Sequence, residues 1–304
     1  MRRSDGCRPT AVRHRWAPGL QWAAVNDWLT PRRRYAALVT RPDEEIELER
    51  AAATIALIAY PELAVDPVIA RIQELAERVL SHVGAAGDPQ ARRAALERVL
   101  FAELELRGND ADYYDPRNSF LNDVLERRLG IPITLSVLYI SVGRRAGLEI
   151  EGVGFPGHFL ARIHLGAGAS ILVDPFAQGR DVSDRDLSAL LSHIAGRDMP
   201  VPPEYLVRSS TRDVLARMLG NLRGIYASRG DAMKTLEVME WLVLTQPDDP
   251  ALRRDRGLLY YRLGALEAAA SDLRAYLLAV PGAEDRGAIE QIVKRAQKPK
   301  PTVH

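Results

Sequence analysis

The sequence predicts an α+β fold in which an N-terminal helical bundle leads into a helix-plus-antiparallel-sheet core, and an all-α module follows. Three observations predict it. Apolar residues recur at helical spacing through residues 43–106, short alternating runs separated by Gly-rich turns occupy residues 148–174, and the last third repeats every 34 residues. With 304 residues and a hydrophobic content of 47%, the chain can bury a sizeable core.

The chain is expected to divide into four segments. Residues 1–40 form a disordered basic arm, residues 41–205 the α+β domain, residues 206–297 the helical module, and residues 298–304 a solvated tail. The Pro-rich stretch "MPVPPEYL" marks the boundary between the two folded parts.

Composition excludes several classes of function. A net charge of +1, from 41 basic and 40 acidic residues, argues against a nucleic-acid binder. The longest apolar run, at 133–142, is too short to span a bilayer, so no membrane association is expected. The single cysteine, Cys7, excludes an internal disulfide framework and any CxxC metal site. We therefore expect a cytoplasmic protein without a metal or other cofactor.

The first third is predicted to contain three helices. The first covers residues 43–60 and ends at Pro61, which lacks the N–H that a continuing helix needs. The second covers residues 68–83 and the third residues 89–106, each with apolar residues along one face. Together they would form the N-terminal bundle.

Two further helices are predicted around a Gly-Ile-Pro sequence. Asn118 or Ser119 can N-cap the first, which ends at Gly130. Pro132 suits the first turn of the second, because its missing N–H has no intrahelical partner there. That helix is expected to end near Gly147.

Three short strands follow, at residues 148–153, 158–165 and 170–174, joined by "PGH" and "GAGAS" turns. An antiparallel arrangement places the start of the second strand beside the end of the third. Beyond the strands, Ser183 opens a helix with Asp186 as its capping-box partner.

The last third contains an internal repeat. Three pairs of identical residues are 34 positions apart, namely Tyr226 and Tyr260, Gly230 and Gly264, and Pro247 and Pro281. That period, with an aromatic residue, a Gly turn and a closing Pro, is typical of tetratricopeptide repeats. Gly257 and Ala269 fit the second copy, whereas Arg223 and Thr235 depart from the pattern in the first. Helices near 211–222 and 286–296 would cap the stack.

His158 and Asp174 are the candidate site residues. His158 begins one predicted strand and Asp174 ends its neighbour, so a carboxylate can lie beside an imidazole. Such a carboxylate orients the ring and stabilises imidazolium, as in a catalytic triad. The alternative is structural, with the histidine bonded to a turn aspartate. His158 and His164 share a strand face, but no third ligand beyond Asp174 completes a metal site.

These motifs resemble a known superfamily. A helix opening with "GIP", a strand opening with "PGHF" and a strand closing with "VDPF" resemble the transglutaminase-like superfamily, which has a cysteine-protease-like core. The stretch from "NSFLNDVLERRLGIP" to "ILVDPFAQGR" is most similar to the SirB-type branch, which commonly carries tetratricopeptide repeats. The resemblance spans roughly residues 41–281.

The resemblance implies roles for particular residues. His158 matches the triad histidine and Asp174 the triad aspartate, but no cysteine stands at or near Pro132, where the resemblance expects the nucleophile. Thr134 and Ser136 are the nearby hydroxyls, and each can instead bond a backbone carbonyl. Asn118, Pro132 and Ser136 are expected to line the cleft.

Three functional hypotheses follow. In the first, the protein is a non-catalytic, degenerate transglutaminase-like protein that binds a peptide or protein partner through the core cleft and the repeat surface. In the second, it is an amide hydrolase or acyltransferase that uses Thr134, Ser136 or water, with His158 as general base. In the third, it is a purely structural scaffold.

Overall fold

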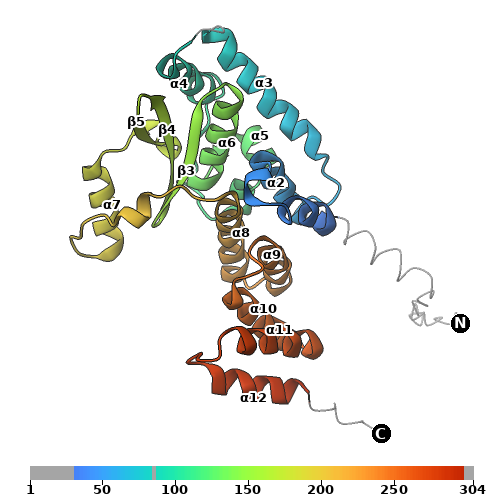
Figure 1. The fold of residues 1–304 in the computed structure, drawn as a ribbon. Coiled ribbons are helices and arrows are strands. Elements are labelled where there is room, and N and C mark those ends of the chain that lie inside the picture. Colours follow the sequence, from blue (N-terminus) through green and yellow to red (C-terminus); the bar gives the residue numbers. More distant parts are fainter. Residues whose placement is uncertain (1–30, 84–86, 298–304) are drawn as a thin grey trace, which may run out of the picture.

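The computed structural model describes residues 31–83 and 87–297 (Figure 1). The helices before the sheet are α2 (Leu48–Thr54), α3 (Val65–Val83), α4 (Pro89–Glu97), α5 (Leu121–Arg127) and α6 (Pro132–Arg145). Those after it are α7 (Asp184–Ala195), α8 (Thr211–Ser228), α9 (Ala232–Thr245), α10 (Pro250–Arg262), α11 (Leu266–Ala279) and α12 (Arg286–Ala296). The predicted order of a helical bundle, an α+β core and an all-α module is confirmed.

The start of the fold differs from the prediction. Residues 31–39 are helical, and Tyr35 and Val39 are fully buried, so assigning residues 31–40 to a disordered arm was wrong. Tyr35 packs on Trp241 at a ring distance of 4.5 Å, and its hydroxyl lies 2.8 Å from the Thr245 hydroxyl. Burial of this aromatic ring against α9 attaches the segment to the fold. The rest of the predicted arm, including Cys7, and the predicted tail lie outside the described residues.

The N-terminal helices are less regular than predicted. Residues 43–60 are divided into a 3₁₀ turn at Asp43–Glu45, α2, and a second 3₁₀ turn at Ile55–Ile58. The third predicted helix is α4 followed by a π-helical turn at Arg98–Glu103. Every residue from Ile55 to Ile58 is buried. Tertiary packing on all sides, rather than an amphipathic pattern with one face in solvent, therefore determines the backbone conformation here.

The ends of α5 were predicted incorrectly. Phe120 is its N-cap residue, whereas Asn118 and Ser119 belong to the preceding 3₁₀ turn. Arg128, at a φ of 62°, ends the helix in the left-handed conformation. Gly130 pairs instead with Gly108 in the short parallel ladder of β1 (Arg107–Gly108) and β2 (Leu129–Gly130).

The main sheet has the strand order β3-β4-β5-β6 and is antiparallel throughout. Its strands are β3 (Glu149–Phe155), β4 (His158–Gly166), β5 (Ala169–Asp174) and β6 (Arg180–Asp181). The three predicted strands are thus present, and α6 packs on β3 and β4. Pro132 opens α6 as predicted, and the helix is buried over most of its length between the sheet and the N-terminal helices (Figure 1).

The C-terminal helices extend from the core as a stack of antiparallel pairs (Figure 1). Ser183 and Asp186 form the predicted capping box of α7. The largest buried cluster runs from Tyr35 to Leu252, so α8 and α9 share one core with α2 and α6. The helices on either side of residue 206 therefore share one continuous hydrophobic core.

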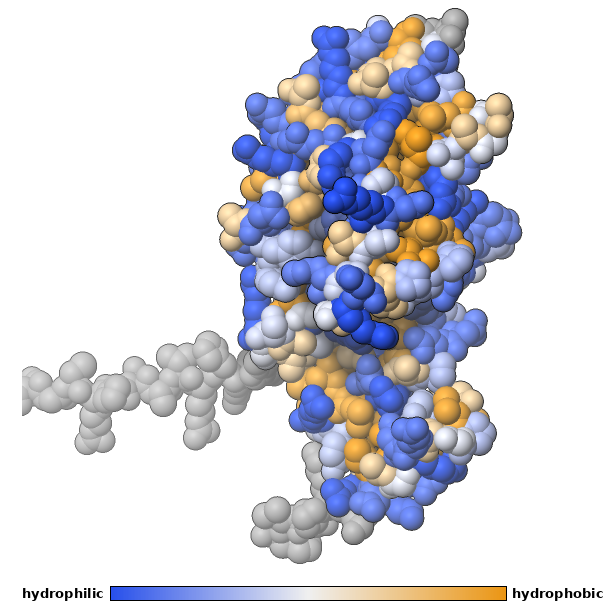
Figure 2. Space-filling model, turned by 90° about the vertical axis from the view of Figure 1, so that its left-hand side faces the viewer, coloured by the Kyte–Doolittle hydropathy of each residue, from blue (hydrophilic) through white to orange (hydrophobic). Residues whose placement is uncertain are grey.

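The visible face in Figure 2 is mostly hydrophilic, with apolar areas interrupted by charged side chains. Large apolar side chains that are exposed come from several distant elements, with Tyr114, Met233 and Leu278 the most exposed. Within the described part of the chain, no helix is both long and apolar enough to cross a membrane.

Candidate functional site

His158 and Asp174 lie in contact at one end of the sheet. Their strands pair antiparallel with Ala161 opposite Val173, which brings the start of β4 beside the end of β5. His158 Nε2 is 2.9 Å from Asp174 Oδ2, and the side chains are only 15% and 12% exposed. The ring nitrogen is not aligned for an N–H···O hydrogen bond, so the antiparallel pairing of the two strands and local packing hold the side chains together.

The two oxygens of Asp174 have different partners. Oδ1 accepts a hydrogen bond from the Phe176 backbone N–H at 2.9 Å and caps the 3₁₀ turn Pro175–Ala177, while Oδ2 faces His158. The Phe176 ring stands edge-on to the imidazole, with ring centroids 6.0 Å apart. A Cβ on Gly108 would clash with the Phe176 ring, so this glycine gives the ring the space it occupies beside His158.

Arg217 of α8 holds the turn that carries His158. Its Nη2 donates to the carbonyl oxygens of Phe155 at 2.8 Å and His158 at 2.7 Å, the paired residues on either side of the β3–β4 turn. Its guanidinium lies 5.6 Å from the centroid of the Phe159 ring. Burial lowers the pKa of Arg217 from its ordinary value. Sequence reasoning missed this residue, because nothing in a helical stretch marks one arginine as a long-range contact.

The hydroxyls at the start of α6 are bonded to the backbone. Thr134 Oγ1 donates to the Asn118 carbonyl at 2.8 Å and accepts the Ile131 N–H at 3.1 Å. Ser136 Oγ donates to the Phe159 carbonyl at 3.0 Å. Both side chains are fully buried. Thr134 thus caps the helix, and Ser136 attaches α6 to β4 next to His158.

The predicted cleft residues are buried. Pro132 lies in the packed first turn of α6, and Asn118 is fully buried. The Asn118 side-chain amide donates to the Asp112 carbonyl at 2.7 Å, and its oxygen accepts from Asn109 at 3.0 Å. The side chain therefore organises the loop before α5, and this competing set of bonds explains why Asn118 does not cap that helix.

Asp115 is a second residue of this polar network. Its carboxylate is bound by Arg117 at 2.7 Å and by Arg127 at 3.1 Å. Burial alone would raise the pKa of Asp115, but hydrogen bonds from Arg117 and the charge of Arg127 outweigh it and hold the pKa below its ordinary value. The described residues contain no group of three His, Cys, Asp or Glu placed to hold a metal ion.

A family model of the transglutaminase-like superfamily matches residues 66–220, which is half of the chain. The chain belongs to the transglutaminase-like superfamily. A tetratricopeptide repeat model matches residues 222–294 directly after it, and together the two matches cover the α+β core and the helical stack. The superfamily match continues into α8, consistent with the core that α8 shares with α6.

Several named proteins are similar to this transglutaminase-like chain. The UPF0162 protein of Xylella fastidiosa strain 9a5c is 36% identical over 248 residues, covering 81% of this chain and 88% of that protein. The UPF0162 protein of Vibrio cholerae is 30% identical over 209 residues, covering 69% and 76%. Human F-box only protein 21 is 33% identical over 180 residues, covering 56% of this chain but 28% of that protein. No solved structure matches the chain.

Proposed function

We propose that the protein is a non-catalytic transglutaminase-like interaction protein that works in the cytoplasm and binds a peptide or protein segment. The proposal rests on the two hydroxyl groups nearest the expected nucleophile position, because both are already engaged in structural hydrogen bonds. Thr134 and Ser136 donate to backbone carbonyls and are fully buried. A nucleophile needs its own base within hydrogen-bond reach, and these groups are committed elsewhere.

The retained His158–Asp174 pair supports a binding role. Among the described residues the His158 ring makes no hydrogen bond, and its buried Nε2 lies 2.9 Å from Asp174 Oδ2. An imidazole that lies beside a carboxylate can bond an amide or carboxylate of a ligand through a free ring nitrogen. In this proposal the residues of a hydrolytic site bind a peptide group without cleaving it.

The helical stack supports a second contact surface. Alternate helices are bridged by ion pairs, Arg223 to Asp255 at 3.4 Å and Arg254 to Asp285 at 3.5 Å. These side chains come from α8, α10 and the residue before α12, so they belong to one side of the stack. A surface of mixed charge suits a polar peptide segment better than an apolar helix.

One observation favours an alternative. The His158 imidazole, which makes no described hydrogen bond, can also act as a general base toward water, with the nearby Asp174 carboxylate stabilising the imidazolium that forms. The protein would then be a slow amide hydrolase without a protein nucleophile. A binding protein would release the bound peptide intact, whereas a hydrolase would slowly cleave it.

Peptide-display selection against the full chain, followed by fluorescence anisotropy, tests the proposed function. We expect selected peptides to bind saturably and to be released uncleaved. His158→Ala should weaken binding about tenfold, the loss expected for one hydrogen bond to a charged group. His193→Ala, on the exposed end of α7, is the matched control and should leave affinity unchanged. Cleavage of bound peptides, or equal affinity of His158→Ala and wild type, would contradict the proposal.

A further inference from the structure

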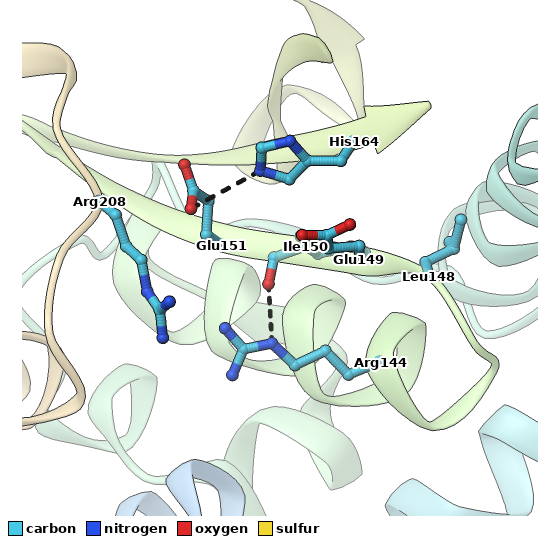
Figure 3. Close-up of a pocket in the computed structure, with 7 residues that line it drawn as sticks. All are labelled: Arg144, Leu148, Glu149, Ile150, Glu151, His164 and Arg208. Atoms are coloured by element: carbon cyan, nitrogen blue, oxygen red, sulfur yellow. Dashed lines mark hydrogen bonds and ion pairs between the residues drawn. The ribbon is translucent and has the colours of Figure 1, made fainter. Parts of the chain in front are cut away.

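A polar groove lies at the edge of the sheet, away from the turn that carries His158. It has a volume of about 330 Å³ and runs along the outer edge of β3 (Figure 3). Arg144, from the last turn of α6, and Arg208, from the segment before α8, enter it from opposite sides. In Figure 3 both guanidinium groups lie on the same side of β3, with their ends directed toward one another.

Within the part of the chain that the structure describes, the two guanidinium groups share no hydrogen-bonded acidic partner. Arg144 Nε donates to the Ile150 carbonyl at 2.7 Å, which fixes the side chain but leaves its charge unneutralised. Among the described residues, the Arg208 side chain makes no hydrogen bond or ion pair. Burial, and next the nearby charge of Arg208, lower the pKa of Arg144 from its ordinary value. Both arginines are exposed, so water screens their repulsion in part, and an anion bound between them would reduce it further.

Glu149 and Glu151 both line the groove, and the second of them is already paired. Glu151 is bound by Arg162 at 2.7 Å and lies 3.6 Å from His164 Nε2, on the other face of the strand (Figure 3). Glu49, whose charge also acts on Arg144, is bound by Arg145 at 2.7 Å. Arg162 and Arg145 offset the carboxylates of Glu151 and Glu49, whereas the exposed Glu149 side chain makes no described hydrogen bond or ion pair. The groove therefore holds two unpaired arginines and one unpaired carboxylate.

We propose that this groove is an oxyanion site whose ligand is a phosphate group, either free or on a small phosphomonoester. Guanidinium groups bind phosphate oxygens through paired, charge-assisted hydrogen bonds, and two convergent arginines match a dianion. The groove has room for part of the molecule that carries the phosphate. The site is separate from the His158–Asp174 pair and is independent of the function proposed for it.

Isothermal titration calorimetry of the full chain with inorganic phosphate and with glycerol 2-phosphate, at constant ionic strength, tests the proposal. We expect saturable binding of one phosphate group per chain. Tighter binding of glycerol 2-phosphate would assign the site to a phosphomonoester, and equal affinities would assign it to the free anion. Arg208→Met should weaken binding at least tenfold and, because its side chain makes no described contact, should fold normally.

Two further variants complete the test. Arg144→Met should weaken binding by a similar factor, with circular dichroism reporting whether loss of its bond to Ile150 alters the fold. Arg197→Met removes one exposed arginine outside the groove and should leave affinity unchanged, which separates the site from the net charge of the chain. Absence of saturable binding, or equal affinity of Arg208→Met and wild type, would overturn the proposal.

Discussion

Replacing Thr134 with valine tests whether its hydroxyl is a structural group. Valine has nearly the same shape but no hydroxyl, so the Asn118 carbonyl loses a donor at 2.8 Å and the Ile131 N–H loses an acceptor at 3.1 Å. Thr134 and Asn118 are fully buried, so water cannot replace these bonds. Each unpaired buried group costs about 1–3 kcal/mol, and we expect a loss of about 2–4 kcal/mol in the free energy of unfolding.

Urea denaturation followed by circular dichroism measures this loss as a lower midpoint at an unchanged slope. Thr40→Val is the matched control, since its hydroxyl also bonds a backbone carbonyl, that of Ala36, but is exposed to water. We expect the control to change stability by less than about 0.5 kcal/mol. A Thr134→Val variant as stable as the control would refute the structural role and return this hydroxyl to the list of possible nucleophiles.

Three further predictions concern packing and charge. Arg217→Met should lower the free energy of unfolding by about 2–3 kcal/mol in urea denaturation, because two carbonyls of the β3–β4 turn lose a charged donor; a smaller loss for Arg217→Lys would fit this cause, and equal losses would not. The lowered pKa of Asp115 stabilises the fold above the ordinary carboxyl pKa of about 3.9, and that contribution disappears as pH falls through the still lower folded value. The stability difference between wild type and Asp115→Asn should therefore shrink from pH 7 to pH 3, and a constant difference would contradict it. Asp272→Ala should destabilise the helical stack by about 3–5 kcal/mol, because Arg256 donates to that carboxylate at 2.6 and 2.8 Å and would stay largely buried without a hydrogen-bonded carboxylate. A thermal midpoint equal to that of wild type would disprove this.

Much of the core could be predicted from local sequence signals. The "GAGAS" turn, the alternation in 148–174 and the proline at the start of α6 are short-range features, and they determined the strands and the contact between His158 and Asp174. The 34-residue repeat similarly predicted the helical stack.

The parts that were missed depend on distant residues. The helix at 31–39 is held by packing on Trp241, and Asn118 fails to cap α5 because its side chain is used by the preceding loop. The contact of Arg217 with the β3–β4 turn joins residues about 60 positions apart. Neither helical periodicity nor turn composition carries information on such contacts.

Amide turnover at the transglutaminase-like core is the most direct test of whether this protein is non-catalytic. Wild type, His158→Ala and Cys7→Ser would each be incubated at equal concentration with a glutamine-containing peptide and a primary amine. Ammonia release, peptide cleavage and amine incorporation would be followed by mass spectrometry. We expect all three proteins to give no more product than buffer without protein. Turnover by wild type that His158→Ala abolishes would contradict this expectation.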